Sequence, residues 1–400
     1  MPRAAIARPA AAPDAHWLNA ERVRGYSSII FGLFAVIAVG WIAWSLPALV
    51  DPQGNPVGID FIGFWSAARL AVTGRPEAAY DWATIQAVEH AAVPALPYLL
   101  NPFVSPPTLL LVLAPFGWLP YPLAFAVFVA GTTALWALLV RRLLPRPAWI
   151  VAAATPAGLI NVLIGQYAFL TAGLAGLALL RLDRRPLAAG VLIGLLCVKP
   201  HLAVLFPLAL LAEARWQTIA AAAATAAVLT FASLAAFGWG TYAALFAHLP
   251  QVAQATTLGA HWRVIPTPFI FALSLRLPVA AAEAIQAMAA LGAAVCVWRA
   301  WRNREAPFEA KAATLVAGSL LCSPYLSYYD LTWAALAIAF LAVLGMRTGF
   351  RRGEREIMLL AWVLPVLMPL FYVATSVQIG FPALALLLFA AIRRAMAPAS

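Results

Sequence analysis

Long apolar segments separated by short polar turns make up most of the 400-residue chain. A helix needs about 20 apolar residues to cross a bilayer, and most of these segments approach that length. The pattern predicts an all-α polytopic membrane protein with about twelve transmembrane helices. The expected spans are residues 26–50, 121–140, 148–163, 166–182, 186–198, 200–213, 216–238, 280–300, 311–326, 330–346, 357–375 and 378–392.

Two further apolar segments, 106–118 and 266–279, are about 13 residues long and too short to cross comfortably. We expect half-helices or re-entrant helices there, because broken helices persist at membrane depth only where protein or a cavity satisfies the backbone. The spans 186–198 and 200–213 are also short, and they meet at Lys199–Pro200, where proline interrupts the helical hydrogen bonding.

The domain plan that follows is a polar segment over 1–25 and one transmembrane domain over 26–395. The first apolar run is too long for the hydrophobic part of a signal peptide, so we expect an uncleaved first span. The longest polar connections, 51–105 and 239–265, are expected as the two large outer loops, the first of them containing amphipathic helices.

Composition supports an integral membrane protein, since 64% of residues are hydrophobic, 10% are charged and the mean hydropathy is +0.88. The net charge of +11 comes from arginines in short turns between spans, not from one basic face, which argues against nucleic-acid binding. By the positive-inside rule these turns and both termini are cytoplasmic, in the inner or plasma membrane. Anionic lipid headgroups are the expected partners of the arginines.

Several classes of site lack their sequence signatures. The three cysteines have no C-x-x-C spacing, and the chain contains no P-loop, G-x-S-x-G, zinc spacing or D-x-D motif. We therefore expect neither a metal nor a cofactor.

Reactive polar groups fall in the turns opposite the arginine-rich ones. Asp60 begins a stretch in which apolar residues recur at helical spacing, as in an interfacial amphipathic helix. An aspartate there can cap the helix, and it can also act as a general base with a pKa raised by desolvation. The two roles are compatible.

Lys199 is one of only two lysines and lies inside an apolar run. A lysine near a span end can extend to the headgroups, but a lysine at membrane depth is costly and usually faces a cavity and a partner. Together with His201, His261 and Arg263 it forms a candidate phosphate-binding cluster, although each of these three alone is more often structural.

Amides and aromatic residues supply candidates for binding a sugar or an acceptor. Asn161 and Gln166 can hydrogen-bond hydroxyl groups or link helices to one another. The stretch "SPYLSYYD" contributes Tyr325, Tyr329 and Asp330, which serve equally well as an interfacial aromatic belt and a helix cap.

Four stretches resemble glycosyltransferase family 87, a family of polytopic GT-C transferases. They are "DFIGFWSAARLAVTGRPEAAYDW", "SPPTLLLVLAPFGWLPY", the block from "GQYAFL" through "LLCVKPHLAVLF" to "EARW", and "SPYLSYYDLTWAALA". Their order and spacing extend over roughly residues 55–345.

The resemblance implies a GT-C-like helical bundle and an inverting transferase at the outer face. It implies a polyprenyl-phosphate-linked donor, with mannose the expected sugar, and a lipid or glycan acceptor. Asp60 takes the place of the catalytic base, and Lys199, Gln166 and Asp330 fall at substrate-binding positions.

Two other classes of function remain open. Broken helices and a buried lysine also occur in transporters and lipid flippases, but those folds usually contain internal repeats and a midplane site. Here the polar groups gather on one side, which favours the enzyme. A noncatalytic membrane scaffold is the third possibility, and Lys199 argues against it.

Overall fold

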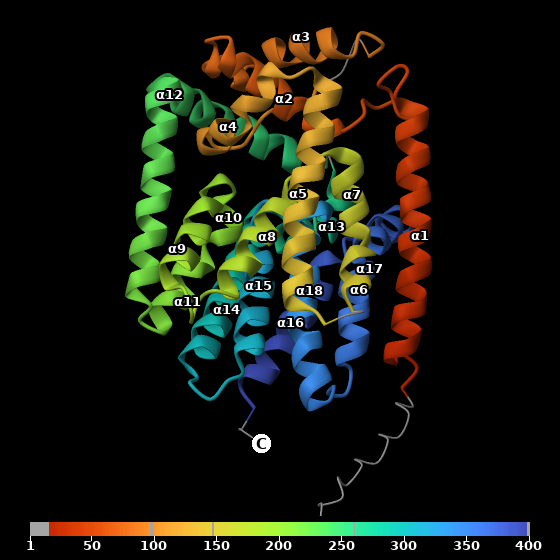
Figure 1. Ribbon diagram of the computed structural model, residues 1–400, viewed down its shortest axis with the longest axis vertical. Coiled ribbons are helices and arrows are strands. Elements are labelled where there is room, and N and C mark those ends of the chain that lie inside the picture. Colours follow the sequence, from red (N-terminus) through yellow and green to blue (C-terminus); the bar gives the residue numbers. More distant parts are fainter. Residues whose placement is uncertain (1–15, 97–99, 146–147, 260, 398–400) are drawn as a thin grey trace, which may run out of the picture.

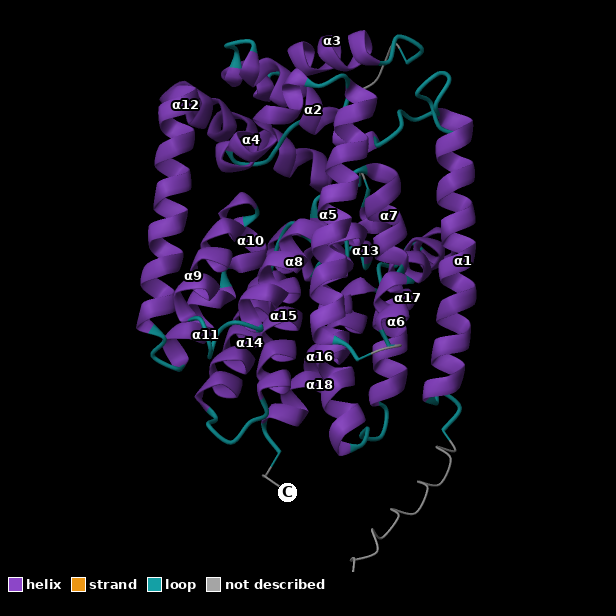
Figure 2. Cartoon of the chain, in the orientation of Figure 1, coloured by secondary structure: helices purple, strands orange, loops and turns teal. Residues whose placement is uncertain are grey.

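The computed structural model describes residues 16–397, except 97–99, 146–147 and 260. Every regular element in these residues is a helix (Figure 2). The expected segment 1–25 lies outside the described residues over its first 15 positions.

Six helices are long and apolar enough to cross a membrane. They are α1 (Ala20–Ser45), α5 (Tyr121–Leu143), α12 (Trp216–Thr257), α14 (Val279–Arg302), η5 with α16 (Tyr328–Leu331 and Thr332–Thr348) and α17 (Glu354–Thr375). The structure therefore supports a multi-pass membrane protein, and about twelve spans are not confirmed.

The remaining predicted spans correspond to shorter helices. These are α6 (Trp149–Ala153), α7 (Pro156–Ile164), α8 (Ala168–Leu179), α9 (Pro186–Gly194), η3 (Leu195–Val198), α10 (Pro200–Ala203), α11 (Leu205–Ala212), α15 (Phe308–Cys322) and α18 (Gly380–Ala395). A proline interrupts the chain of helices where α7 begins, at Pro156, and where α10 begins, at Pro200. The two segments expected as half-helices form α4 (Pro107–Leu113) with η2 (Ala114–Trp118), and α13 (Pro268–Ser274) after η4 (Trp262–Val264). All are short, but a re-entrant path is not confirmed.

The helices form a bundle with a helical cap at one end (Figure 1). The cap contains α2 (Ile59–Val72), η1 (Pro76–Tyr80), α3 (Trp82–Ala92) and α4. At Gly238 the backbone of α12 leaves helical geometry, and its second part packs against α4 and η1. The arginine-rich ends of α14, α16 and α18 lie at the other end of the bundle (Figure 1).

The helical cap of the bundle differs from the sequence prediction at α2. Eight of its residues are buried, including the polar Ser66, so neighbouring helices enclose α2 and it does not lie on an interface with one face. Its N-cap is Gly58, whereas Asp60 lies in the first turn. The expectation of an Asp60 cap is therefore wrong. The burial of α2 has its physical reason in η2 and α4, which pack against the face that the sequence alone left unpartnered. The N-cap is Gly58 because its left-handed backbone, with φ 66°, leads directly into α2.

Candidate functional site

The carboxylate of Asp60 is held by an amide from a distant helix pair. The Nε2 of Gln166 donates to Oδ2 of Asp60 at 2.7 Å. The backbone N–H of Tyr167 donates to Oε1 of Gln166, so the oxygen end of this amide is already used and its NH₂ end faces the carboxylate. Oδ1 of Asp60 accepts no hydrogen bond from the described residues, and the side chain is partly accessible.

Two glycines with positive φ bring these side chains together. Gly58 precedes α2 with φ 66°, and Gly165 ends α7 with φ 73°. A Cβ on Gly165 would lie 2.4 Å from Cβ of Phe61, and one on Gly58 would lie 2.5 Å from the ring of Phe125. Only glycine permits both the left-handed backbone and this close approach, so the turn before Gln166 packs directly against the start of α2.

Burial raises the pKa of Asp60 from 3.8 to about 6. The hydrogen bond from Gln166 and the charge of Lys199 lower this pKa, and the charge of Asp330 raises it. A carboxyl group with a pKa near 6 is mostly ionised at neutral pH and accepts a proton more readily than an ordinary aspartate, as a general base requires.

Lys199 lies at the break between η3 and α10, where Pro200 begins the next helix. Its Nζ lies 2.5 Å from Oδ1 of Asp330, and both side chains are enclosed, with exposures of 6% and 2%. The ammonium also lies 4.8 Å from the ring centroid of Tyr167 and 5.0 Å from that of Tyr329. A buried lysine is expected to have a partner, and here the partner is an aspartate 131 residues further along the chain.

Local hydrogen bonds fix Asp330 in place. Ser327 and Asp330 form a reciprocal capping box around η5, with the backbone N–H of Ser327 donating to Oδ2 at 3.3 Å. The two oxygens of Asp330 thus have separate partners, the η5 backbone and Lys199. Asp330 is the N3 residue of a capping box whose N-cap is Ser327, and it is also the ion-pair partner of Lys199.

Asn161 links three elements through its amide. Its Nδ2 donates to the carbonyl of Tyr329 and to the hydroxyl of Thr332, both at 3.0 Å, and Oδ1 accepts from the backbone N–H of Ala168. The side chain is buried. This geometry favours the helix-linking alternative over contact with a sugar.

The other predicted residues occupy different positions. The hydroxyl of Ser327 donates to the carbonyl of Val264 at 3.5 Å, so η4, which carries the exposed Arg263, lies against the start of η5. His201 adjoins Lys199, and its Nε2 is buried without a partner among the described residues. His261 and Tyr325 are exposed, and within the described residues neither forms a hydrogen bond with Lys199.

Tyr167 is the contributor that sequence reasoning missed. Its hydroxyl lies 3.2 Å from that of Ser105, whose carbonyl accepts a hydrogen bond from the hydroxyl of Tyr80. Tyr167 interacts electrostatically with both Asp60 and Lys199. It follows Gln166 directly in "GQY", and this position next to a candidate residue could have identified Tyr167 from the sequence.

The described residues contain no group of three histidine, cysteine or acidic side chains arranged to hold a metal ion.

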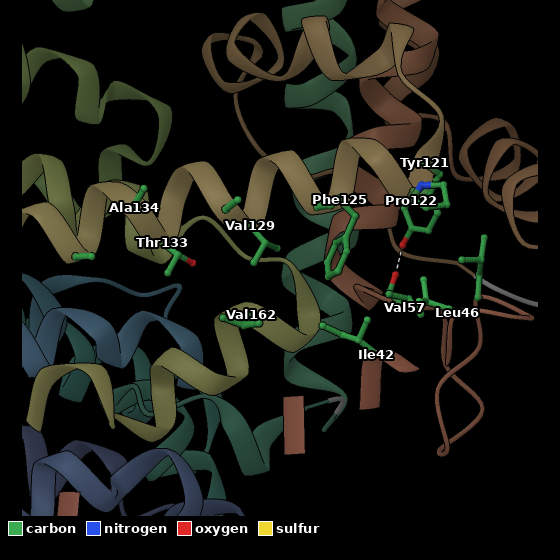
Figure 3. Close-up of a pocket in the computed structure, with 14 residues that line it drawn as sticks. Ile42, Leu46, Val57, Tyr121, Pro122, Phe125, Val129, Thr133, Ala134 and Val162 are labelled. Carbon is green, nitrogen blue, oxygen red and sulfur yellow. Dashed lines mark hydrogen bonds between the residues drawn. The ribbon is translucent and has the colours of Figure 1, made fainter. Parts of the chain in front are cut away.

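An apolar groove of about 610 Å³ begins beside this site and follows α5 (Figure 3). Its walls include Ile42 of α1, Leu46 directly after that helix, one face of α5 between Tyr121 and Ala137, and Val57 and Val162. The Tyr121 hydroxyl donates to the carbonyl of Val57, as the dashed line in Figure 3 shows. Val57 is three residues from Asp60, and Val162 is four residues from Gln166.

Comparison with known proteins identifies the family. The model of glycosyltransferase family 87 matches residues 103–324, more than half of the chain. Searches of curated proteins and of solved structures gave no match. The matched range contains Gln166 and Lys199, while Asp60 and Asp330 lie on either side of it and are brought to their partners by the fold. The chain belongs to glycosyltransferase family 87, and is a membrane glycosyltransferase of the GT-C type.

Proposed function

We propose that the protein is an inverting transferase that moves a sugar, with mannose as the expected one, from a polyprenyl-phosphate donor to a lipid or glycan acceptor. The reaction takes place at the outer face of the cell membrane. The observation that carries the proposal is the Asp60 carboxylate, which has a raised pKa, one oxygen fixed by Gln166 and the other unoccupied among the described residues.

Asp60 is the general base in this proposal. Its Oδ1 accepts the proton of the acceptor hydroxyl as that oxygen attacks C1 of the sugar from the face opposite the phosphate. The C1–O bond to phosphate breaks, and its electron pair leaves with the polyprenyl phosphate. Gln166 acts as a positioning residue, because its Nε2 holds Oδ2 and so orients Oδ1.

Cations stabilise the phosphate as it leaves. Lys199 is enclosed and paired with Asp330, so it contributes mainly through its electrostatic field, and it contacts the phosphate directly only if Asp330 releases it. Arg263 is exposed, forms no ion pair in the described part of the chain and lies in η4, which adjoins η5, so it is proposed as the first contact of the phosphate. His201 and His261 complete the proposed phosphate region. Tyr325 precedes η5 and Tyr329 lies in it, and both are proposed to contact the sugar or the acceptor.

The apolar groove beside α5 suits the prenyl chain of the donor. Its lining extends from Tyr121 to Ala137, 17 residues whose 16 helical steps span about 24 Å at 1.5 Å per residue. The groove begins next to the Asp60 end of the site, so a lipid lying in it would carry its phosphate towards the polar cluster. Apolar walls facing an isoprenoid need no specific polar contacts.

Transfer itself is tested with purified protein in nanodiscs, a panel of polyprenyl-phosphate sugars and membrane extract as acceptor. We expect a glycosylated product with inverted anomeric configuration and release of polyprenyl phosphate. If no donor and acceptor of the panel yield a product while the donors stay unhydrolysed, the proposal is contradicted. A product formed only with nucleotide sugars would move the enzyme to another donor class.

The outer location is tested separately by single-cysteine labelling in intact cells, in a background lacking the native cysteines. A cysteine at Gln53, in the loop before α2, should react with an impermeant maleimide, whereas one at Arg352, between α16 and α17, should not. The reverse pattern would place the site on the cytoplasmic side.

A further inference from the structure

A second, polar pocket of about 710 Å³ lies far from Asp60, at the arginine-rich end of the bundle. It is formed where the α11–α12 turn meets the end of α14 and the start of α15, at the lower left of Figure 1. Its charged lining consists of Glu213, Arg215, Arg302, Arg304 and Lys311. The family assignment and the proposed reaction use none of these side chains.

Internal ion pairs account for only part of this charge. Glu213 accepts from Lys311 at 2.7 Å and from Arg215 at 2.8 Å, and Arg215 also lies 2.7 Å from Asp183. These two cations and two carboxylates cancel one another. The exposed Arg302 and Arg304 form no ion pair in the described part of the chain, so the pocket retains two uncompensated positive charges.

The position of Lys311 is costly in itself. It lies in the first turn of α15, where the helix dipole disfavours a positive charge, and its side chain is largely buried. A single carboxylate, Glu213, holds it there, and Glu213 is shared with Arg215. An anion entering the pocket would offset the charges of Arg302 and Arg304, which no carboxylate of the pocket lining pairs with.

Two exposed tryptophans beside the pocket favour a position at the level of lipid headgroups. Trp216 follows Arg215 directly and is 64% exposed, and Trp298 is 41% exposed with the guanidinium of Arg302 5.9 Å above its ring. Tryptophan concentrates at membrane interfaces, and basic pockets between helices on the cytoplasmic side suit lipid phosphates.

We propose that this pocket is a binding site for a phosphate group, supplied by the headgroup of an anionic phospholipid in the leaflet opposite the candidate active site. Arg302 and Arg304 contact the phosphate, while Arg215 and Lys311 lie behind them and are kept in place by Glu213. The tryptophans favour a lipid over a free phosphate in solution as the source.

The test uses the full chain in neutral detergent, titrated with short-chain phosphatidylglycerol and followed by its thermal unfolding midpoint. Phosphatidylcholine and inorganic phosphate are titrated in parallel. Arg302→Gln/Arg304→Gln removes the two uncompensated charges and leaves the internal ion pairs intact. Arg141→Gln/Arg142→Gln is the matched control, because it removes two exposed arginines from the last turn of α5, outside the pocket.

We expect phosphatidylglycerol to stabilise the wild type and the control alike, and to bind the pocket variant about tenfold more weakly, which corresponds to about 1.4 kcal/mol. Arg304→Gln alone should change binding in the same direction, with an unliganded midpoint equal to that of the wild type. Equal responses in pocket and control variants would overturn the site. Stabilisation by inorganic phosphate as strong as that by the lipid would overturn the lipid as its source.

Discussion

Replacing Asp60 with asparagine separates catalysis from stability at the candidate site. Asparagine retains the size of the side chain, and its Oδ1 can still accept from Gln166 Nε2, so the contact between α2 and the Gly165 turn is preserved. The general base is lost. Positioned acid–base groups contribute about 10²–10⁴ in rate, so we expect kcat to fall by that factor, equivalent to about 2.7–5.4 kcal/mol of activation free energy.

The same substitution should stabilise the fold at neutral pH. Because the pKa of Asp60 rises from 3.8 in the unfolded chain to about 6 in the folded protein, the folded state binds the proton more tightly. Ionisation therefore costs stability as pH rises from about 4 to about 6, and the full cost is present above pH 6. Two pKa units correspond to about 3 kcal/mol. The uncharged Asp60→Asn side chain avoids this cost, so its advantage should disappear as pH falls towards 4.

Turnover with a polyprenyl-phosphate sugar and thermal unfolding would both be measured across pH 4 to 8. Wild-type kcat/KM should decline below about pH 6 as the carboxylate is protonated. Asp81→Asn is the matched control, since it changes an exposed aspartate that caps α3 in the same helical cap of the bundle. Wild-type turnover by Asp60→Asn, or an Asp60→Asn protein less stable than wild type at pH 7, would refute the reasoning.

Three other substitutions test the surroundings of the base. Lys199→Met leaves Asp330 buried without its partner and should cost about 3–5 kcal/mol of stability. The double variant Lys199→Met/Asp330→Asn should recover stability in thermal unfolding, but it should not recover turnover. Recovery of both would contradict a role for the lysine. Gln166→Leu removes a hydrogen bond that lowers the pKa of the base, so the acidic limb of the pH–rate profile should move to higher pH; an unchanged profile would remove the positioning role. Gly165→Ala should lower the unfolding midpoint far more than Gly74→Ala, because both have positive φ but only Gly165 has neighbours within 4 Å of an added Cβ; equal effects would mean that packing at this turn is loose.

Much of the helical architecture could be predicted from the sequence, because each span carries its own hydrophobic signal. The runs at 121–140 and 280–300 became α5 and α14, with boundaries within a few residues. The break expected at Lys199–Pro200 is present, since proline acts on its own backbone and on the residue before it. The number of spans could not be predicted from hydropathy alone. Helices as short as α7 and α9 satisfy hydropathy but not length, and packing against neighbours determines how they lie.

The candidate site was likewise predictable only in part from the sequence. Residue type and surroundings identified Asp60 and Lys199, because a charge within or beside an apolar run is costly and must be compensated. The compensating groups are set by contacts across 106 residues for Asp60 and Gln166 and across 131 residues for Lys199 and Asp330. No local pattern specifies such pairings. Only the folded bundle could show that Gln166 serves the carboxylate, that Asn161 links helices, and that η2 and α4 cover α2.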